Sequence, residues 1–438
     1  MSKFIGKCCF FAVFAFLGFP LYAVAPREAD SVYTIERCYE LVRENFPLVK
    51  RYDMIELTKE FTLKNAYMNY FPQISISGSA SYQTEALTFP FDIPWIDMPT
   101  FSKDQYSAII ELSQVIWDGG MIAADRENIR AKSDVQMAEQ EISMYALKEK
   151  VNDLYFGILY IDQQMRQSEV MDSELERERR RIEICIENGV ANPSDLDVID
   201  VERISQKQAR DNMRSLMDAY LRMLSMMTGV KIDDSGMLVR PLPEGADGEA
   251  VLNSILQADI RRPELMLYKA QKREIDTQLD FWTAGGLPQI SLFIRGGYAR
   301  PGLNMMDDTF HPFAVGGIRL VWNISRLYSL GYGKKIVDYS KAQVDVAEQT
   351  FLFNTNLQSQ EQISEVRRFL KAIEDDRKIV SLRESIRKSV SAGVENGTKN
   401  ASDLIGEMNR ETLAKRQLMM HEIEMMKSLY ELKTIRNN

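Results

Sequence analysis

Apolar and polar residues alternate with a period of two in four segments of the chain, which is typical of strands with one apolar and one polar face. In the first segment, at about 73–83, the even positions from Ile74 to Tyr82 are apolar or small and the intervening odd positions are serines. The same alternation predicts further strands at about 105–117, 289–298 and 313–324. Each segment is about as long as a tilted strand that crosses a bilayer. The pattern also fits a soluble antiparallel sheet that covers a core.

Between the strands the sequence favours long helices. Residues 121–188 contain no proline, and only Gly157 interrupts good helix formers. A continuous helix of this length would extend over about 100 Å, and it would be stable only when packed against other helices. Coiled-coil spacing occurs twice, in Leu216, Tyr220, Met223 and Met227 and in Ile379, Leu382, Ile386 and Val390. We therefore expect an α+β fold in which long helices form bundles.

A ten-residue motif occurs twice, as ENGVANPSDL at 187–196 and ENGTKNASDL at 395–404, with seven identical positions. In each copy a glycine, Gly189 or Gly397, follows a long helical segment, where a left-handed residue commonly ends a helix. Asn192 and Asn400 are then placed to cap a returning helix, and an aspartate follows at its third position. We expect both motifs to be helical-hairpin tips, at 187–195 and 395–403, and to lie at the same end of the molecule.

The duplication extends to the strands, since YFPQIS at 70–75 has the counterpart GLPQIS at 286–291. It predicts one unit, of helix, two strands and a long helical hairpin, that is used twice. The first repeat spans 24–230 and the second 261–438. An irregular connector at 231–260 joins them and is expected to pack outside the helical bundle.

The N-terminus has the layout of a secretory signal peptide at 1–23. Lys3 and Lys7 precede or flank an apolar run at 8–22, and small residues follow it, with cleavage expected after Ala23. The mature chain then keeps only Cys38 and Cys185, which do not make a disulfide framework. We therefore expect an exported protein.

Charge and residue types exclude several function classes. The formal net charge of −9 gives no electrostatic basis for binding nucleic acid. The two histidines, His311 and His421, lack the spacing of a metal site, and GYGKK at 331–335 does not have the order of a phosphate-binding loop. The sequence indicates no catalytic residues, no cofactor, no metal and no enzyme activity.

Taken together, these features resemble the TolC-like outer-membrane efflux proteins, the outer-membrane factors of tripartite exporters. The resemblance rests on the opening helix YTIERCYELVRENFPLV, both strand starts, the strand-to-helix turn SQVIWDGG, RRPEL at 261–265 and the two tips. It covers essentially the whole mature chain.

The resemblance implies a homotrimer in the outer membrane of a Gram-negative bacterium. Three chains would close a twelve-stranded β-barrel in outer-membrane lipid, and twelve helices would continue it as a coiled-coil tunnel through the periplasm. Such proteins are passive exit ducts for efflux or secretion. They work with a periplasmic adaptor protein and an inner-membrane pump or transporter.

The resemblance also assigns roles at the tips. Gly189, Val190, Gly397 and Thr398 would dock the adaptor, while Asp195, Lys399 and Asp403 would form a periplasmic gate or charge ring. Six carboxylates from three chains would favour cations, although each aspartate also fits a purely structural role at a helix N-terminus. Val394 and Gly406 depart from the family's pattern, so the mouth would be held closed differently.

Two further expectations remain. The loop at 84–104 is rich in aromatic residues and proline, and we expect it at the outer mouth of the barrel. The alternative to a duct is a non-conducting periplasmic or outer-membrane coiled-coil scaffold, which does not need apolar faces on four strands.

Overall fold

The computed structural model describes residues 32–86, 95, 102–189, 192–243, 247–396 and 398–437. The expected signal peptide, most of the loop at 84–104, and the tip residues Val190 and Gly397 lie outside these ranges. The helices of the first half are α1 (Ile35–Asn45), α2 (Lys50–Tyr67), α3 (Met121–Tyr145), α4 (Leu147–Glu187) and α5 (Pro193–Thr228). The connector contains α6 (Gly248–Gln257), and the second half contains α7 (Pro263–Gly285), α8 (Arg326–Glu395) and α9 (Ala401–Arg436). The strands are β1 (Gln73–Tyr82), β2 (Asp104–Trp117), β3 (Gln289–Arg300) and β4 (His311–Val321).

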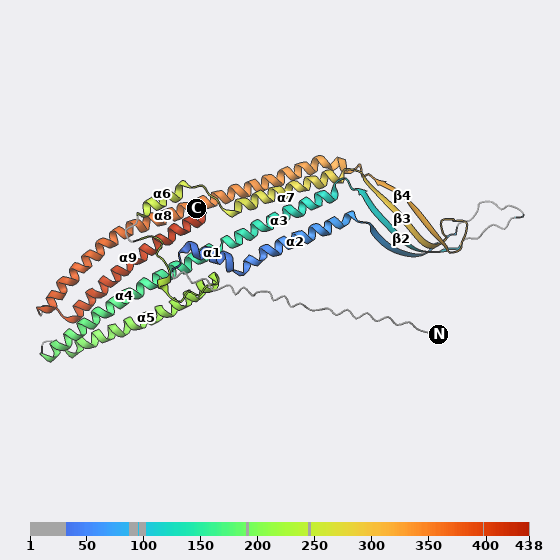
Figure 1. The fold of residues 1–438 in the computed structure, drawn as a ribbon. Helices are drawn as coiled ribbons and strands as arrows, with labels where there is room; N and C mark the ends of the chain where they lie inside the picture. Colours follow the sequence, from blue (N-terminus) through green and yellow to red (C-terminus); the bar gives the residue numbers. More distant parts are fainter. Residues whose placement is uncertain are drawn as a thin grey trace, which may run out of the picture.

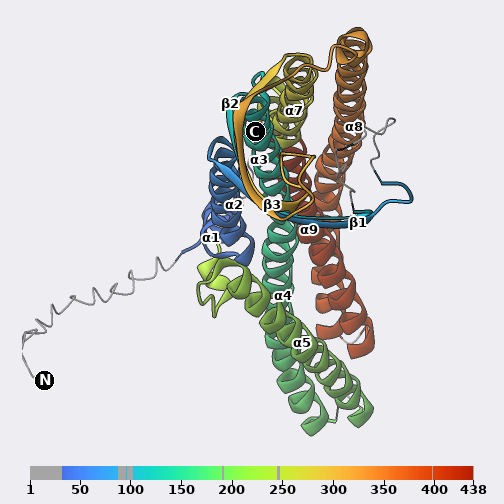
Figure 2. The same cartoon turned by 90° about the vertical axis from the view of Figure 1, so that its right-hand side faces the viewer.

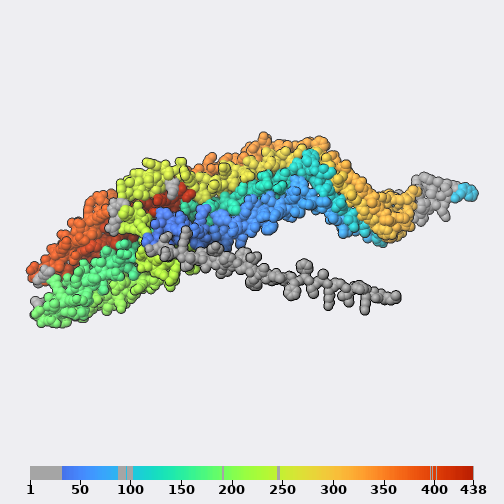
Figure 3. Space-filling model, viewed as in Figure 1, coloured from blue at the N-terminus to red at the C-terminus, as the bar shows by residue number. Residues whose placement is uncertain are grey.

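The molecule is long and bent, with the sheet at one end and the tips of two helical hairpins at the other (Figures 1 and 3). Next to the sheet, α2 packs on α3, α3 on α7, and α7 on α8, so four helices lie side by side. Towards the tips, the pairs α4–α5 and α8–α9 form the two hairpins, and α4 packs against α9. Viewed along the helices, the strands form an arc over the helix ends (Figure 2).

The sheet is antiparallel throughout, in the order β1-β2-β3-β4. Even positions pair with even positions and odd with odd, except at an irregularity between Val115 and Trp117. The apolar and polar faces that the alternation predicted therefore continue across all four strands. Side chains on the apolar face are open to the surroundings, with 79% of Ile76 and 70% of Ile318 exposed.

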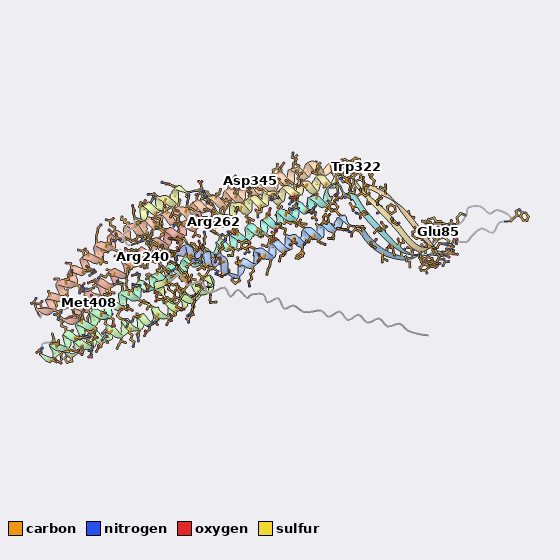
Figure 4. All side chains as sticks on the ribbon, viewed as in Figure 1. Glu85, Arg240, Arg262, Trp322, Asp345 and Met408 are labelled. Atoms are coloured by element: carbon orange, nitrogen blue, oxygen red, sulfur yellow. The ribbon has the colours of Figure 1, made fainter. Side chains whose placement is uncertain are left out.

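The expectation that the last strand continues to residue 324 is wrong, because β4 ends at Val321. Trp322 marks the junction between sheet and helices (Figure 4), where its indole Nε1 donates a hydrogen bond to the carbonyl of Gly286 at 3.0 Å. This bond holds the chain beside the end of α7. The amide of Arg326 then donates to the carbonyl of Asn323 and turns the chain into α8. The hydrogen bond to distant Gly286 and the turn that follows it thus end the period-two pattern.

The predicted helix at 121–188 is divided at Ala146, with α3 before it and α4 after it. Gly157 lies inside α4 and contacts α5. A Cβ atom at this position would be 2.5 Å from the ring of Tyr220. The glycine therefore allows the aromatic ring of α5 to pack directly on the backbone of α4.

The main core lies in the middle of the molecule, where both halves meet the connector. Fully or almost fully buried side chains there include Ile35, Tyr155, Phe156, Leu224, Leu252 and Leu429. The hydroxyl of Tyr155 donates to the carbonyl oxygens of Tyr33 and Val239, which joins the segment before α1 and the connector to α4. Helix α6 of the connector packs on α8 and α9. Within the part of the chain that the structure describes, none of the helices is both long enough and apolar enough to span a membrane.

Candidate functional site at the hairpin tips

The first tip turns at Gly189, which has the predicted left-handed backbone. Its φ is +73°, and its amide donates to the carbonyl of Ile186 at 2.9 Å. A Cβ atom at this glycine would have no heavy atom within 4 Å. The backbone conformation, and not a lack of space, is therefore what favours glycine here.

Both returning helices begin with the same reciprocal cap. At the first tip, Asp195 Oδ2 accepts from the amide of Asn192 at 3.2 Å, and Asn192 Oδ1 accepts from the amide of Ser194 at 3.2 Å. At the second tip, Asp403 Oδ2 accepts from the amide of Asn400 at 3.2 Å, and Asn400 Oδ1 accepts from the amide of Asp403 at 2.7 Å. Each aspartate thus has a structural role within its own tip.

At the second tip, one backbone carbonyl accepts several hydrogen bonds. The oxygen of Gly393 accepts from the amides of Thr398 and Lys399, at 2.9 and 3.2 Å, and from the hydroxyl of Thr398 at 3.0 Å. The side chain of Lys399 lies back over Gly393, where a Cβ atom would be 2.8 Å from Lys399 Cγ. Thr398 and Lys399 are both exposed at the end of the molecule.

The two tips are brought together by one apolar cluster. Its buried members are Met171, Leu175, Ile182, Ile199, Leu404, Ile405 and Met408, with Ile186, Leu196, Val390 and Val394 packed against them. They come from all four hairpin helices, and Met408 is labelled in Figure 4. The prediction that both tips lie at the same end is confirmed (Figure 1). Val394 belongs to this cluster, whereas a Cβ atom at Gly406 would meet no heavy atom within 4 Å.

Ion pairs connect the helices of the first hairpin behind its tip. Arg179 of α4 contacts Asp200 of α5 at 2.9 Å, and Arg203 of α5 contacts Glu176 of α4 at 2.5 Å. The hydrogen bond that Arg179 donates to the carboxylate of Asp200 raises the pKa of Arg179. Charged residues of the segment ERERRR at 176–181 thus bridge the two helices.

The second hairpin contains buried charges that the sequence analysis missed. Glu411 of α9 is only 4% exposed, and its carboxylate contacts Arg387 of α8 at 2.5 Å and Lys415 at 2.7 Å. Burial alone raises the pKa of Glu411, but the hydrogen bonds from Lys415 and Arg387 outweigh it and hold that pKa below its ordinary value. Glu407, one turn nearer the tip, contacts Arg383 at 3.4 Å.

A signal for this network is present in the sequence. Positions 404, 408, 411, 415, 418, 422, 425 and 429 follow coiled-coil spacing along α9, and three of them are Glu411, Lys415 and Glu422. Charged residues at core positions of an otherwise apolar stripe indicate a polar layer between paired helices. Its partners on α8 could be identified only from the structure.

Among the described residues, no group of three or more histidine, cysteine, aspartate and glutamate side chains is arranged to hold a metal ion. His311 contacts Asp307, and His421 contacts Asp376, each as a separate pair.

No family model matches the sequence, and no curated protein matches it. Several solved structures do. The chain is similar to the outer-membrane channel OprN, with 14% identity and a TM-score of 0.61 over 92% of this chain and 89% of that chain. It is similar to CusC, with 13% identity and a TM-score of 0.60 over 92% and 91% of the chains. It is also similar to the outer membrane protein VceC from Vibrio cholerae, with 10% identity and a TM-score of 0.60 over 92% and 95%. At these identities the likeness concerns the fold.

Proposed function

The chain has the TolC-like fold, and from this premise we propose that it is a passive exit duct in the outer membrane of a Gram-negative bacterium. It extends into the periplasm and serves a tripartite efflux or secretion system as a homotrimer. The observation that carries this proposal is the likeness to outer-membrane channels over 92% of the chain, which includes the sheet as well as the helices.

The sheet supports the trimer because its two outer strands suit closure. β1 and β4 are the edges, and four antiparallel strands make these edges run in opposite directions. β4 of one chain can therefore pair antiparallel with β1 of the next, and three chains give twelve strands. The exposed apolar face then meets lipid, as in membrane barrels.

The helices support the same assembly. In the layer next to the sheet, the edge helices α2 and α8 carry exposed apolar stripes, with Phe61 on α2 and Tyr339 and Phe353 on α8. Towards the tips, Ile204 of α5 and Leu382 of α8 are exposed in the same way. Because the two apolar edges differ, one edge of a chain would pack against the other edge of the next chain, in a head-to-tail contact. Such contacts close into a ring when equal rotations between neighbouring chains add up to a full circle.

The tips are the docking end of this duct. Gly189, Val190, Gly397 and Thr398 form the surface for a periplasmic adaptor protein, and an inner-membrane pump or transporter supplies substrate and energy. Asp195, Lys399 and Asp403 form the charge ring at the periplasmic mouth. The exposure of Gly189, Thr398, Lys399 and Asp403 at the end of the molecule supports this assignment, as do the caps that contain Asp195 and Asp403.

The molar mass of the mature protein in mild detergent tests the assembly. Light scattering with the detergent contribution subtracted should give three chains, and the same preparation should conduct ions across a planar bilayer. A stable monomer without conductance would contradict the duct and leave the non-conducting scaffold.

A photo-cross-linking residue tests the docking surface. Placed at Thr398 in native cells, it should capture a periplasmic adaptor. The matched control is Met305, in the β3–β4 connection, which lies at the end of the sheet farther from the helices and the tips. Capture of the same adaptor from Met305, or from neither position, would contradict docking at the tips.

A further inference from the structure

The polar face of the sheet carries a local positive charge. Among the strand residues that the structure describes, the odd positions of this face bear three formal charges, from Glu111, Arg295 and Arg319. Two arginines and one glutamate leave one net positive charge per chain, although the whole chain has a formal charge of −9. Much of the remaining face is serine: Ser75, Ser77, Ser79, Ser81, Ser107, Ser113 and Ser291. The positive charge of this face is therefore concentrated at one level along the strands.

The register of three strands builds this cluster. Glu111 of β2 lies opposite Arg295 of β3. Arg295 Nε and Nη2 donate to one oxygen of the Glu111 carboxylate at 3.0 and 2.7 Å, and Arg319 Nη2 of β4 donates to the other oxygen at 3.3 Å. One carboxylate is shared by two guanidinium groups, which together have ten N–H donors. Arg295 and Arg319 are 41% and 43% exposed, so donors remain for a passing ligand.

Two aromatic rings lie beside glycines on the same face. The guanidinium of Arg319 is 4.8 Å from the centroid of Phe293. The ring of Phe293 covers Gly317, and that of Phe313 covers Gly297, since a Cβ atom at either glycine would be 3.2 Å from the ring. At Gly317 the glycine leaves room for the ring of Phe293, whereas at Gly297 an added Cβ atom would first meet the backbone oxygen of Ala108. Apolar surface is thus placed directly beside the positive charge.

We propose that Glu111, Arg295, Arg319, Phe293 and Phe313, here called the arginine girdle, make the duct selective for organic anions with an aromatic or apolar body. The inference rests on the proposed function, because only a closed trimer brings three copies to one height around a lumen. There, six arginines and three glutamates leave three positive charges. Rings of arginine favour anions, as rings of acidic residues favour cations. The phenylalanine rings favour an organic anion over a small inorganic one.

The experiment compares variants of the trimer in planar bilayers under a tenfold KCl gradient. Relative to the wild type, Arg319→Gln should shift the permeability ratio from chloride towards potassium, and Arg319→Glu should shift it further, whatever the carboxylates at the periplasmic mouth contribute to both. The last change alters the ring by six charges and should shift the chloride-to-potassium permeability ratio by about tenfold. In liposomes, efflux of carboxyfluorescein relative to the cation rhodamine 6G should fall in Arg319→Glu. Arg319→Lys is the conservative variant, which keeps the charge and should restore the permeability ratio of the wild type.

The outcomes separate this inference from the proposed function. No trimer or no conductance in the wild type would overturn the duct itself. A conducting trimer whose permeability ratio is the same in wild type and Arg319→Glu would overturn the arginine girdle and leave the duct intact. If Arg319→Glu does not assemble, Arg319→Cys can be modified after insertion with negatively or positively charged methanethiosulfonates. Only the negative reagent should then shift the permeability ratio towards potassium.

Discussion

At the scale of single residues, two glycines near the tips show how the same residue type serves different purposes. Gly189 has a left-handed backbone, whereas Gly406 lies inside α9, and a Cβ atom would meet no heavy atom within 4 Å at either position. The two positions therefore differ in backbone conformation and not in available space. Substitution by alanine tests that difference directly.

We expect Gly189→Ala to destabilise the first tip by about 1 kcal/mol, because alanine is strained at positive φ. Gly406→Ala should instead stabilise the second hairpin by about 0.5–1 kcal/mol, because alanine favours the helix. Hydrogen exchange of the tip peptides measures both effects as changes in local opening. Equal effects of the two substitutions would show that backbone conformation does not distinguish these glycines.

At the scale of an element, the buried charges between α8 and α9 determine how the second hairpin is held. Glu411 is bonded to Arg387 and Lys415, and the carboxylate is almost completely buried. Buried charge pairs add little compared with an apolar pair, but breaking one leaves an uncompensated charge. The network therefore makes the pairing of these two helices sensitive to single substitutions.

We expect Glu411→Gln to destabilise the α8–α9 hairpin by about 3 kcal/mol, since Arg387 loses its buried partner. Glu374→Gln is the matched control, because Glu374 contacts Lys378 at 2.8 Å on an exposed surface, where an ion pair contributes little. Hydrogen exchange of α9 should accelerate strongly in the first variant and hardly in the second. Similar exchange in both would contradict a structural role for the buried pair.

The same carboxylate predicts a pH dependence. The folded state holds the pKa of Glu411 below its ordinary value of 4.5, so the unfolded state binds a proton more readily. The stability from ionised Glu411 is therefore fully present above pH 4.5 and is lost as the pH falls below that value, through the lower folded pKa. We expect hydrogen exchange of α9, corrected for the intrinsic rate, to show this loss in the wild type. Glu411→Gln should lack the part of the pH dependence that comes from protonation of Glu411. An identical pH profile in both proteins would contradict the role of this carboxylate.

At the scale of the whole molecule, one chain leaves apolar surface uncovered along both of its edges. Phe61 of α2 is 61% exposed and Phe353 of α8 is 63% exposed. We expect Phe61→Glu or Phe353→Glu to weaken the trimer, because each places a charge at the proposed contact between chains. Light scattering in detergent should show a lower mass. Met305→Gln, away from the helices, should leave the mass unchanged, and a trimer of normal stability in both edge variants would place the contact elsewhere.

Local features of the sequence predicted much of this fold. Period-two alternation located the four strands, since neighbouring residues of a strand point to opposite faces wherever the strand lies. The repeated motif located the tips, because a left-handed glycine and a reciprocal cap depend only on residues within one turn. The strand prediction failed at Trp322, where a hydrogen bond to distant Gly286 ends the pattern.

The sequence by itself determined the strands, the long helices, the hairpin turns and the duplication, because each depends on interactions between residues close in the chain. Tertiary structure alone decided which apolar stripes are buried between helices of one chain and which remain open along α2, α5 and α8. It also decided that Glu411 meets Arg387 and that Glu111 is shared by Arg295 and Arg319. These contacts join residues far apart in the chain, and their geometry follows from helix packing and strand register.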